Sequence, residues 1–128
     1  MLAIRSTTRT KAPISFGAFS ALAQKTLGDR YDLSLVVCGN ALTRSFNKKF
    51  RGKDKPANIL TFPLDKHTGE IFINSQSLAR EAREWNTTEK KYALFLFYHG
   101  LLHLKGLSHK TMESREDAFK KKLGIPTH

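Results

Sequence analysis

The run TEKKYALFLFYHGLLHLKGLSH, residues 88–109, shapes the expectations for the whole chain. Its side chains are apolar on nearly every side from Tyr92 to Leu104, which predicts a helix that crosses the middle of the fold. Thr88 is placed to cap the start of this helix, and Gly106 is placed to end it in a left-handed conformation. Three of the five histidines of the chain lie toward the end of the run. The same segment therefore predicts a core helix that carries histidines toward its end.

Shorter elements are predicted on both sides of this helix. The predicted strands are LAIRST (2–7), DLSLVVCG (32–39), NILTFP (58–63) and GEIFIN (69–74). Further helices are predicted at 13–28, at 41–50 after an Asn40 cap, at 75–85, and at 112–123 after a Thr111 cap. Strands and helices mixed around one buried helix indicate an α+β or α/β fold, in a single domain that spans residues 1–128.

Composition limits the partners. Lys and Arg number 22 against 11 Asp and Glu, a net charge of +11, and most of the excess lies in residues 1–55. A positive electrostatic field of this kind attracts polyanions, nucleic acid first of all; a merely soluble, basic surface is the alternative.

The single cysteine, Cys38, excludes an internal disulfide and fits a reducing compartment. No apolar run approaches the roughly 20 residues that cross a bilayer, and residues 1–16 lack the apolar core of a secretory signal.

The histidines predict a metal site. His99 and His103 are four residues apart and share one face of the helix, so they can hold one ion from two corners. Gly106 stops the helix, and His109 can then approach from another direction as a third ligand. Three neutral imidazoles and a water leave an open position, which is the catalytic zinc pattern. Each histidine taken alone would more often be an ordinary core or surface residue, but the spacing predicts one Zn²⁺ per chain at His99, His103 and His109.

The same spacing occurs in the metzincin protease signature H-E-x-x-H-x-x-G-x-x-H, so the helix is metzincin-like. Here Gly100 follows the first histidine, where the proteases have the Glu that acts as general base. That replacement argues against a metallopeptidase, although not against a zinc-activated water. Glu113 and Glu70 are the carboxylates considered for a place near the metal, and neither is assigned.

At this point the residues resemble a known family. HGLLHLKGLSH (99–109) resembles the H-G-x-L-H-L-x-G-x-D-H signature of the YbeY family, bacterial metal-dependent endoribonucleases of rRNA processing. FRGKDKPANILTFPL (50–64) is similar to that family's R-x-K-D-x-P-T-N/D-V-L-S-F-P segment, GEIFIN to its G-D-I-x-I strand, and MESREDAFKKKLGI (112–125) to its closing M-x-x-x-E helix. Ser108, Ala57, Thr61 and Glu70 stand where the family usually has Asp, Thr, Ser and Asp.

The resemblance implies a fold and a cellular role. The implied fold is a mostly parallel four-stranded sheet packed with helices, with the metal-binding helix at its centre. The implied activity is zinc-dependent cleavage of single-stranded RNA in rRNA maturation, at the 3′ end of 16S rRNA, and in ribosome assembly and quality control. The implied partners are rRNA, the small ribosomal subunit, one of its proteins and a ribosome-assembly GTPase. The implied location is the cytoplasm, without a membrane partner.

Residue roles follow from this activity. Arg51, in the family-like FRGKD loop, is the predicted catalytic arginine, because a guanidinium fork matches phosphate oxygens. RNA is predicted to bind a basic segment, residues 44–55, through Arg44, Lys48, Lys49, Lys53 and Lys55. A solvated helix face and turn is the alternative for these cations, and a local ion pair or a turn hydrogen bond is the interpretation favoured for Asp54. Ser108 keeps open a second function, that of a ribosome-assembly factor that binds RNA and protein with little or no cleavage.

Overall fold

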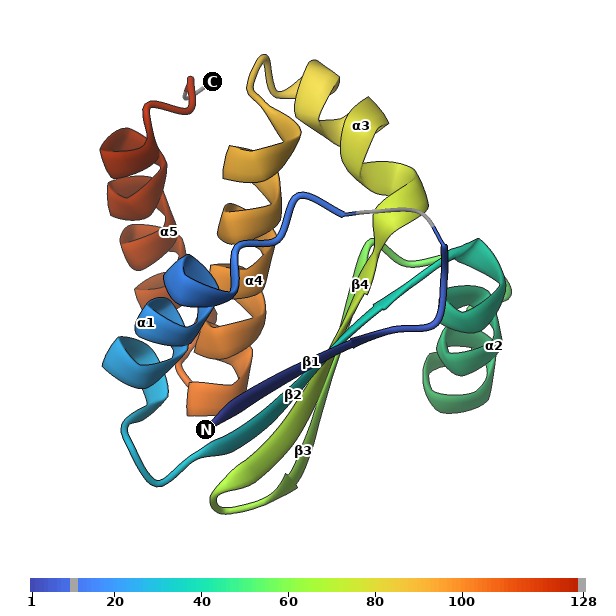
Figure 1. The fold of residues 1–128 in the computed structure, drawn as a ribbon, viewed down its shortest axis with the longest axis horizontal. Helices are drawn as coiled ribbons and strands as arrows, with labels where there is room; N and C mark the ends of the chain where they lie inside the picture. Colours follow the sequence, from blue (N-terminus) through green and yellow to red (C-terminus); the bar gives the residue numbers. More distant parts are fainter. Residues whose placement is uncertain (10–11, 127–128) are drawn as a thin grey trace.

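The computed structural model describes residues 1–9 and 12–126. Its four strands are β1 (Leu2–Ser6), β2 (Asp32–Cys38), β3 (Ile59–Asp65) and β4 (Thr68–Asn74). They form one sheet in the order β1-β2-β4-β3 (Figure 1). β1 pairs with β2 and β2 with β4 in parallel, whereas β3 pairs with β4 antiparallel. The predicted mixed, mostly parallel four-stranded sheet is thus confirmed, and β3 lies at one of its edges.

Helices cover both faces of the sheet. They are α1 (Phe16–Leu27), α2 (Asn40–Arg51), α3 (Ser75–Glu84), α4 (Glu89–Lys105) and α5 (His109–Leu123). Because alternate residues of a strand point to opposite faces, Leu35 and Ile71 pack in one core with α1, α3 and α4, while Val36 and Phe72 pack with α2. Figure 1 shows α2 standing apart from the other helices. The result is an α+β fold with two apolar layers around the sheet.

Helix α4 lies in the middle of the fold, as its apolar sequence predicted. It contacts α1, α3 and α5 as well as strands β3 and β4, and its Phe97, Leu101 and Leu102 are fully buried. Both predicted ends are confirmed: the Thr88 side chain accepts the backbone N–H of Lys91, and Gly106 has φ 77°. None of the described helices is both long and apolar enough to span a membrane.

Two predicted caps are wrong. Ser108, not Thr111, caps α5, because Ser108 has an extended backbone and its Oγ accepts the Thr111 N–H at 3.3 Å. Helix α5 therefore begins at His109. At α2 the cap is Gly39, and Asn40 is already helical, with its side-chain oxygen accepting a hydrogen bond from Asn74 Nδ2 at 2.7 Å. The consequence for the site is that His109 belongs to a helix and not to a loop.

Candidate active site

The two histidines of α4 form a close pair. His99 and His103 lie one turn apart, with their Nε2 atoms 3.0 Å from each other and their ring planes at 80°. This is the shared helix face that the spacing predicted. The pair presents two neighbouring imidazole nitrogens at one place on the surface of α4.

Glu116 of α5 holds the far side of His99. Its Oε1 contacts His99 Nδ1, and its side chain is only 19% exposed. An ionised carboxylate accepts hydrogen bonds but has no proton to donate. We therefore assign the proton of His99 to Nδ1, which leaves the lone pair of Nε2 facing His103. Carboxylate-backed histidines of this kind are typical of metal ligands, because the carboxylate fixes the tautomer and the ring orientation.

Glu116 was not predicted from the sequence. Of the two carboxylates considered there, neither Glu113 nor Glu70 forms a hydrogen bond or ion pair with His99 or His103 among the described residues. Two signals could have found Glu116. It lies seven residues, about two helical turns, after His109, so both share a face of α5. It is also the Glu of the M-x-x-x-E block that resembles the YbeY family.

The surroundings of His103 favour its neutral form. Burial lowers its pKa, the neighbouring His99 lowers it further, Glu116 opposes these effects, and His109 and Arg51 add to the lowering. Neutral imidazole is the form that coordinates a metal ion, so the local electrostatics favour the chemistry that the spacing predicted.

The third predicted ligand stands apart from the pair. His109 is exposed in the first turn of α5. Within residues 1–9 and 12–126, no group of three or more His, Cys, Asp and Glu side chains is gathered closely enough to hold a metal ion. The structure therefore brings together two of the three predicted ligands and leaves His109 close enough to contribute to the lowered pKa of His103.

The histidine pair opens into a cleft with a volume of about 550 Å³, which we call the histidine cleft. It is lined by Phe50, Arg51, Asn58, Ile59, Leu60, Thr61, Phe62, His99 and His103. These residues come from the end of α2, from the edge strand β3 and from α4. Arg51, predicted as catalytic, is thus brought into one cleft with His99 and His103 from a distant part of the sequence.

Gly100 sets how closely α4 approaches β3. A Cβ atom at this position would lie 3.0 Å from the side chains of both Ile59 and Ile71. Even a methyl group here would require these side chains to shift by a few tenths of an ångström. The longer Glu that metallopeptidases carry at this position would require a larger shift, which is a physical argument against that alternative.

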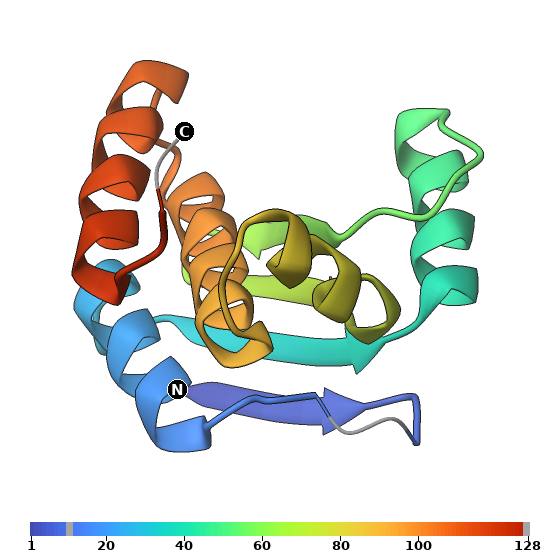
Figure 2. The same cartoon turned by 90° about the horizontal axis from the view of Figure 1, so that it is seen from above.

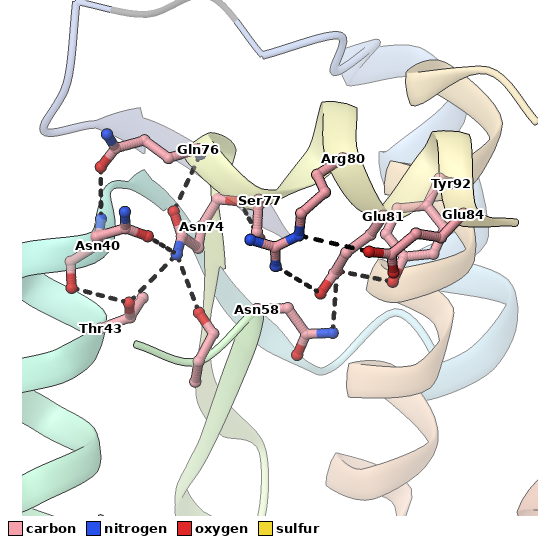
Figure 3. A network of polar contacts seen from close by, with 11 residues as sticks. Asn40, Thr43, Asn58, Asn74, Gln76, Ser77, Arg80, Glu81, Glu84 and Tyr92 are labelled. Atoms are coloured by element: carbon pink, nitrogen blue, oxygen red, sulfur yellow. Dashed lines mark hydrogen bonds and ion pairs between the residues drawn. The ribbon is translucent and has the colours of Figure 1, made fainter. Parts of the chain in front are cut away.

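A polar network supports the start of β3 (Figure 3). Asn58, which lines the histidine cleft, donates to Glu81 Oε1 at 3.3 Å, and Glu81 also accepts the Tyr92 hydroxyl at 2.8 Å. Burial, and then the hydrogen bond to Glu81, raise the pKa of Tyr92, so its hydroxyl remains a donor. On the other side, Asn74 donates to the carbonyl of Ala57 at 3.2 Å. The chain between Arg51 and β3 is thereby tied to α3, α4 and β4.

The basic segment surrounds Arg51 but mostly lies outside the cleft. Arg44 donates to Asp54 at 2.8 Å and Lys48 reaches Asp54 at 4.0 Å, so the local ion pair expected for Asp54 is confirmed. The hydrogen bond from Arg44 holds the pKa of Asp54 below its usual value. Five predicted RNA-binding residues, Arg44, Lys48, Lys49, Lys53 and Lys55, do not line the histidine cleft. Only Arg51 of the six cations does.

An α+β protein that places paired imidazoles and a guanidinium in one open cleft has the chemistry of a hydrolase of phosphate esters. Comparison with known families narrows this class: a family model described as Endoribonuclease YbeY matches residues 6–126, and the chain belongs to that family. The predicted kind of enzyme, a hydrolase that acts on RNA, is confirmed by this membership.

Individual proteins similar to this chain carry the same family description. An Endoribonuclease YbeY of Chelativorans sp. is 34% identical over 110 residues, covering 78% of this chain and 68% of the relative. One of Ehrlichia ruminantium is 35% identical over 104 residues, covering 73% and 66%. The chain thus matches about two thirds of the length of these relatives. A solution structure of a Thermotoga maritima protein, 26% identical, superposes with a TM-score of 0.67 and covers 96% of this chain and 89% of that one.

Proposed function

We propose that this protein is a zinc-dependent endoribonuclease that cuts single-stranded RNA and acts in rRNA maturation at the 3′ end of 16S rRNA. The observation that carries the proposal is the presence of His99, His103 and Arg51 in one cleft, although they come from distant parts of the sequence. Membership of the YbeY endoribonuclease family supports the same activity.

The residues fit a metal ion. Two Nε2 atoms 3.0 Å apart, with Glu116 behind His99 and a lowered pKa at His103, make a suitable pair of metal ligands. His109, in the first turn of α5, is the proposed third ligand, for one Zn²⁺ per chain. When bound there, zinc supplies a Lewis acid and lowers the pKa of water. In this arrangement α4 is the central metal-binding helix, and its ligand spacing is metzincin-like.

The chain's own residues bind and orient the RNA. Arg51 lines the cleft, where its guanidinium can hold the phosphate as negative charge develops. Phe50 is 57% exposed beside Arg51, and an exposed ring in a cleft offers a stacking surface for an unpaired base. This favours single-stranded substrates. The cations of the basic segment, Arg44, Lys48, Lys49, Lys53 and Lys55, are proposed to bind the flanking backbone.

The cellular setting is part of the same proposal. The proposed partners are the small ribosomal subunit, one of its proteins and a ribosome-assembly GTPase, and the proposed location is the cytoplasm. A role in ribosome assembly and quality control would follow from the rRNA substrate. These partners rest on the family resemblance of the sequence motifs.

One observation favours a second candidate, an assembly factor with little cleavage. Ser108 replaces the usual Asp before His109, and its hydroxyl is engaged in capping α5, donating to Thr111 Oγ1 at 3.0 Å while accepting from the Thr111 N–H. It therefore offers no carboxylate beside His109, where an Asp could orient a ligand or a water.

The two candidates differ in one experiment. The protein is stripped of metal with a chelator, reloaded with zinc, and incubated with end-labelled single-stranded and duplex RNA of the same sequence. The endoribonuclease cuts the single strand internally after reloading and loses this activity on chelation. Tight RNA binding without internal cleavage in the zinc-loaded protein would favour the assembly factor.

A further inference from the structure

A second hollow lies on a different face of α4 from the histidine cleft. Its volume is about 370 Å³, and we call it the basic groove. It is lined by Leu22, Lys25 and Thr26 of α1, Tyr98 and Lys105 of α4, and Arg115, Ala118, Phe119 and Lys122 of α5. Figure 2 shows α1 and α5 on the side of α4 that is turned away from α2. Successive residues of α4 thus face different sites: Tyr98 the groove, His99 the cleft.

The charge of the basic groove is uncompensated. Lys25, Lys105, Arg115 and Lys122 are all exposed. Within the described parts of the chain none of the four has an acidic partner at salt-bridge distance, and no acidic residue lines the groove. Helix α5 does carry three acidic side chains, Glu113, Glu116 and Asp117, but they lie outside the groove. Four cations from three helices around one hollow repel one another and attract a polyanion.

The floor of the groove is aromatic. The rings of Tyr98 and Phe119 lie with centroids 4.4 Å apart and an interplanar angle of 39°, and Leu22 lies beside them in the lining. Both rings are half-buried, so each keeps part of its surface open to the hollow. A cationic rim over an aromatic floor is the combination with which proteins bind single-stranded nucleic acid, the cations taking phosphates and the rings taking bases.

We propose that the basic groove binds a second segment of the single-stranded RNA, separate from the segment in the histidine cleft. The proposal rests on the proposed function for the identity of the polyanion and goes beyond it in naming a further binding site. Because the two sites lie on different faces of α4, a short RNA fills only the cleft, and a longer RNA fills both. The groove therefore contributes affinity for long RNA.

A charge-matched pair of variants tests this. The groove variant combines Lys105→Gln, Arg115→Gln and Lys122→Gln. The control combines Arg30→Gln, Lys90→Gln and Lys121→Gln, which remove the same charge from exposed positions outside both sites. Dissociation constants are measured under chelation, so that RNA is not cut, for single strands of about 6 and about 30 nucleotides at several salt concentrations. Thermal unfolding checks that both variants are folded.

The expected result is specific to length and position. The groove variant loses affinity for the long RNA, and its slope of log K against log salt falls by about 2, since each phosphate contact of a single strand contributes about 0.7. The short RNA and the control variant change far less. Equal behaviour of groove and control variants on the long RNA would overturn the proposal.

A second measurement tests whether RNA contacts the aromatic residues at the floor of the groove. Long RNA that carries 4-thiouridine is expected to photocrosslink to peptides containing Tyr98 or Phe119, and Phe119→Leu, which keeps apolar packing, should reduce this crosslink. Loss of polyglutamate binding in the groove variant, with normal RNA binding, would assign the groove to an acidic protein and overturn the proposal. Failure of this proposal can be told apart from failure of the proposed function. Normal RNA cleavage with a groove that does not contribute to binding would overturn only the groove proposal. Groove-dependent RNA binding without cleavage would overturn only the endoribonuclease proposal.

Discussion

The histidine cleft and the basic groove lie on two faces of the same helix and differ in how their polar groups are held. In the cleft, His99 is fixed between Glu116 and His103, and Gly100 sets the distance of α4 from β3. In the groove, four cations have no acidic partner among the described residues. The difference follows from what each site must do. A reacting group must be held in one geometry, whereas attraction of a polyanion requires only charge within reach.

The largest effect is expected from His103→Ala. Removing one of two adjacent imidazoles should abolish stoichiometric metal binding and cleavage, while long RNA still binds through the basic segment and the groove. Elemental analysis of the purified variant measures the metal. His67→Ala, in the β3–β4 turn, is the matched control and should keep its metal. Full metal occupancy in His103→Ala would break the division between a cleft for chemistry and surfaces for binding.

Arg51→Ala should have the next largest effect. If Arg51 binds the phosphate mainly as it gains charge, turnover falls about 10²–10³-fold with little loss of RNA affinity. Arg51→Lys should rescue poorly, because a point charge does not replace a planar fork. Single-turnover cleavage at saturating enzyme measures the rate. A normal rate would place Arg51 with the cations that only attract RNA.

Features of the fold that depend on local interactions could be predicted from the sequence, and features that depend on distant interactions could not. Apolar periodicity and turn residues predicted each strand and helix of the described residues, because these patterns are local. The order of the strands, β1-β2-β4-β3, was not predicted, since the family resemblance implied only a mostly parallel four-stranded sheet. The cap at Ser108 was missed because Ser108 and Thr111 are both good capping residues, and the backbone conformation selects between them.

The site was predictable where its residues share one helix. The spacing of His99 and His103 placed them correctly, since i and i+4 positions always meet. The contact of Glu116 with His99 joins two helices, so it depends on how α5 packs against α4. The spacing from His109 and the M-x-x-x-E block mark Glu116 as a candidate but do not give this contact. The basic groove draws on three helices and was invisible in the sequence for the same reason.

Glu116→Gln should sharpen the comparison by loosening the cleft without removing a ligand. The amide keeps the shape but replaces the charged acceptor behind His99, and such partners typically contribute about 10–100-fold to metal affinity. Competition with a chelating dye measures the zinc dissociation constant. Glu113→Gln on the same helix is the control and should leave it unchanged. Equal effects of both variants would mean that Glu116 acts only through its charge.

Gly100→Ala tests the packing that positions the cleft. The added methyl group would meet Ile59 and Ile71 at 3.0 Å, so we expect a loss of about 1–3 kcal/mol in the free energy of unfolding. Denaturant unfolding measures it. Gly17→Ala in α1 is the control, since a Cβ there has nothing within 4 Å and alanine favours a helix. A Gly100→Ala protein as stable as the original would show that the neighbouring side chains yield to the methyl group and that Gly100 does not set the distance between α4 and β3.

The smallest effect is expected from Asp54→Asn, which tests whether the basic segment behaves as the groove does. Arg44 and Lys48 share the carboxylate of Asp54 at 2.8 and 4.0 Å, and all three side chains are more than half exposed. Because the carboxylate competes with RNA phosphates for these cations, its removal should raise affinity a few-fold. The slope of log K against log salt should steepen by about 0.7, the share of one phosphate contact.

Salt-dependent binding of a short RNA measures this slope. The triple variant Lys48→Gln, Lys49→Gln and Lys53→Gln is expected to flatten it by about 2. Weaker RNA binding in Asp54→Asn would mean that the carboxylate positions Arg44 for the RNA. The basic segment would then resemble the cleft, in which partners hold each group in place, and only the groove would present cations without acidic partners.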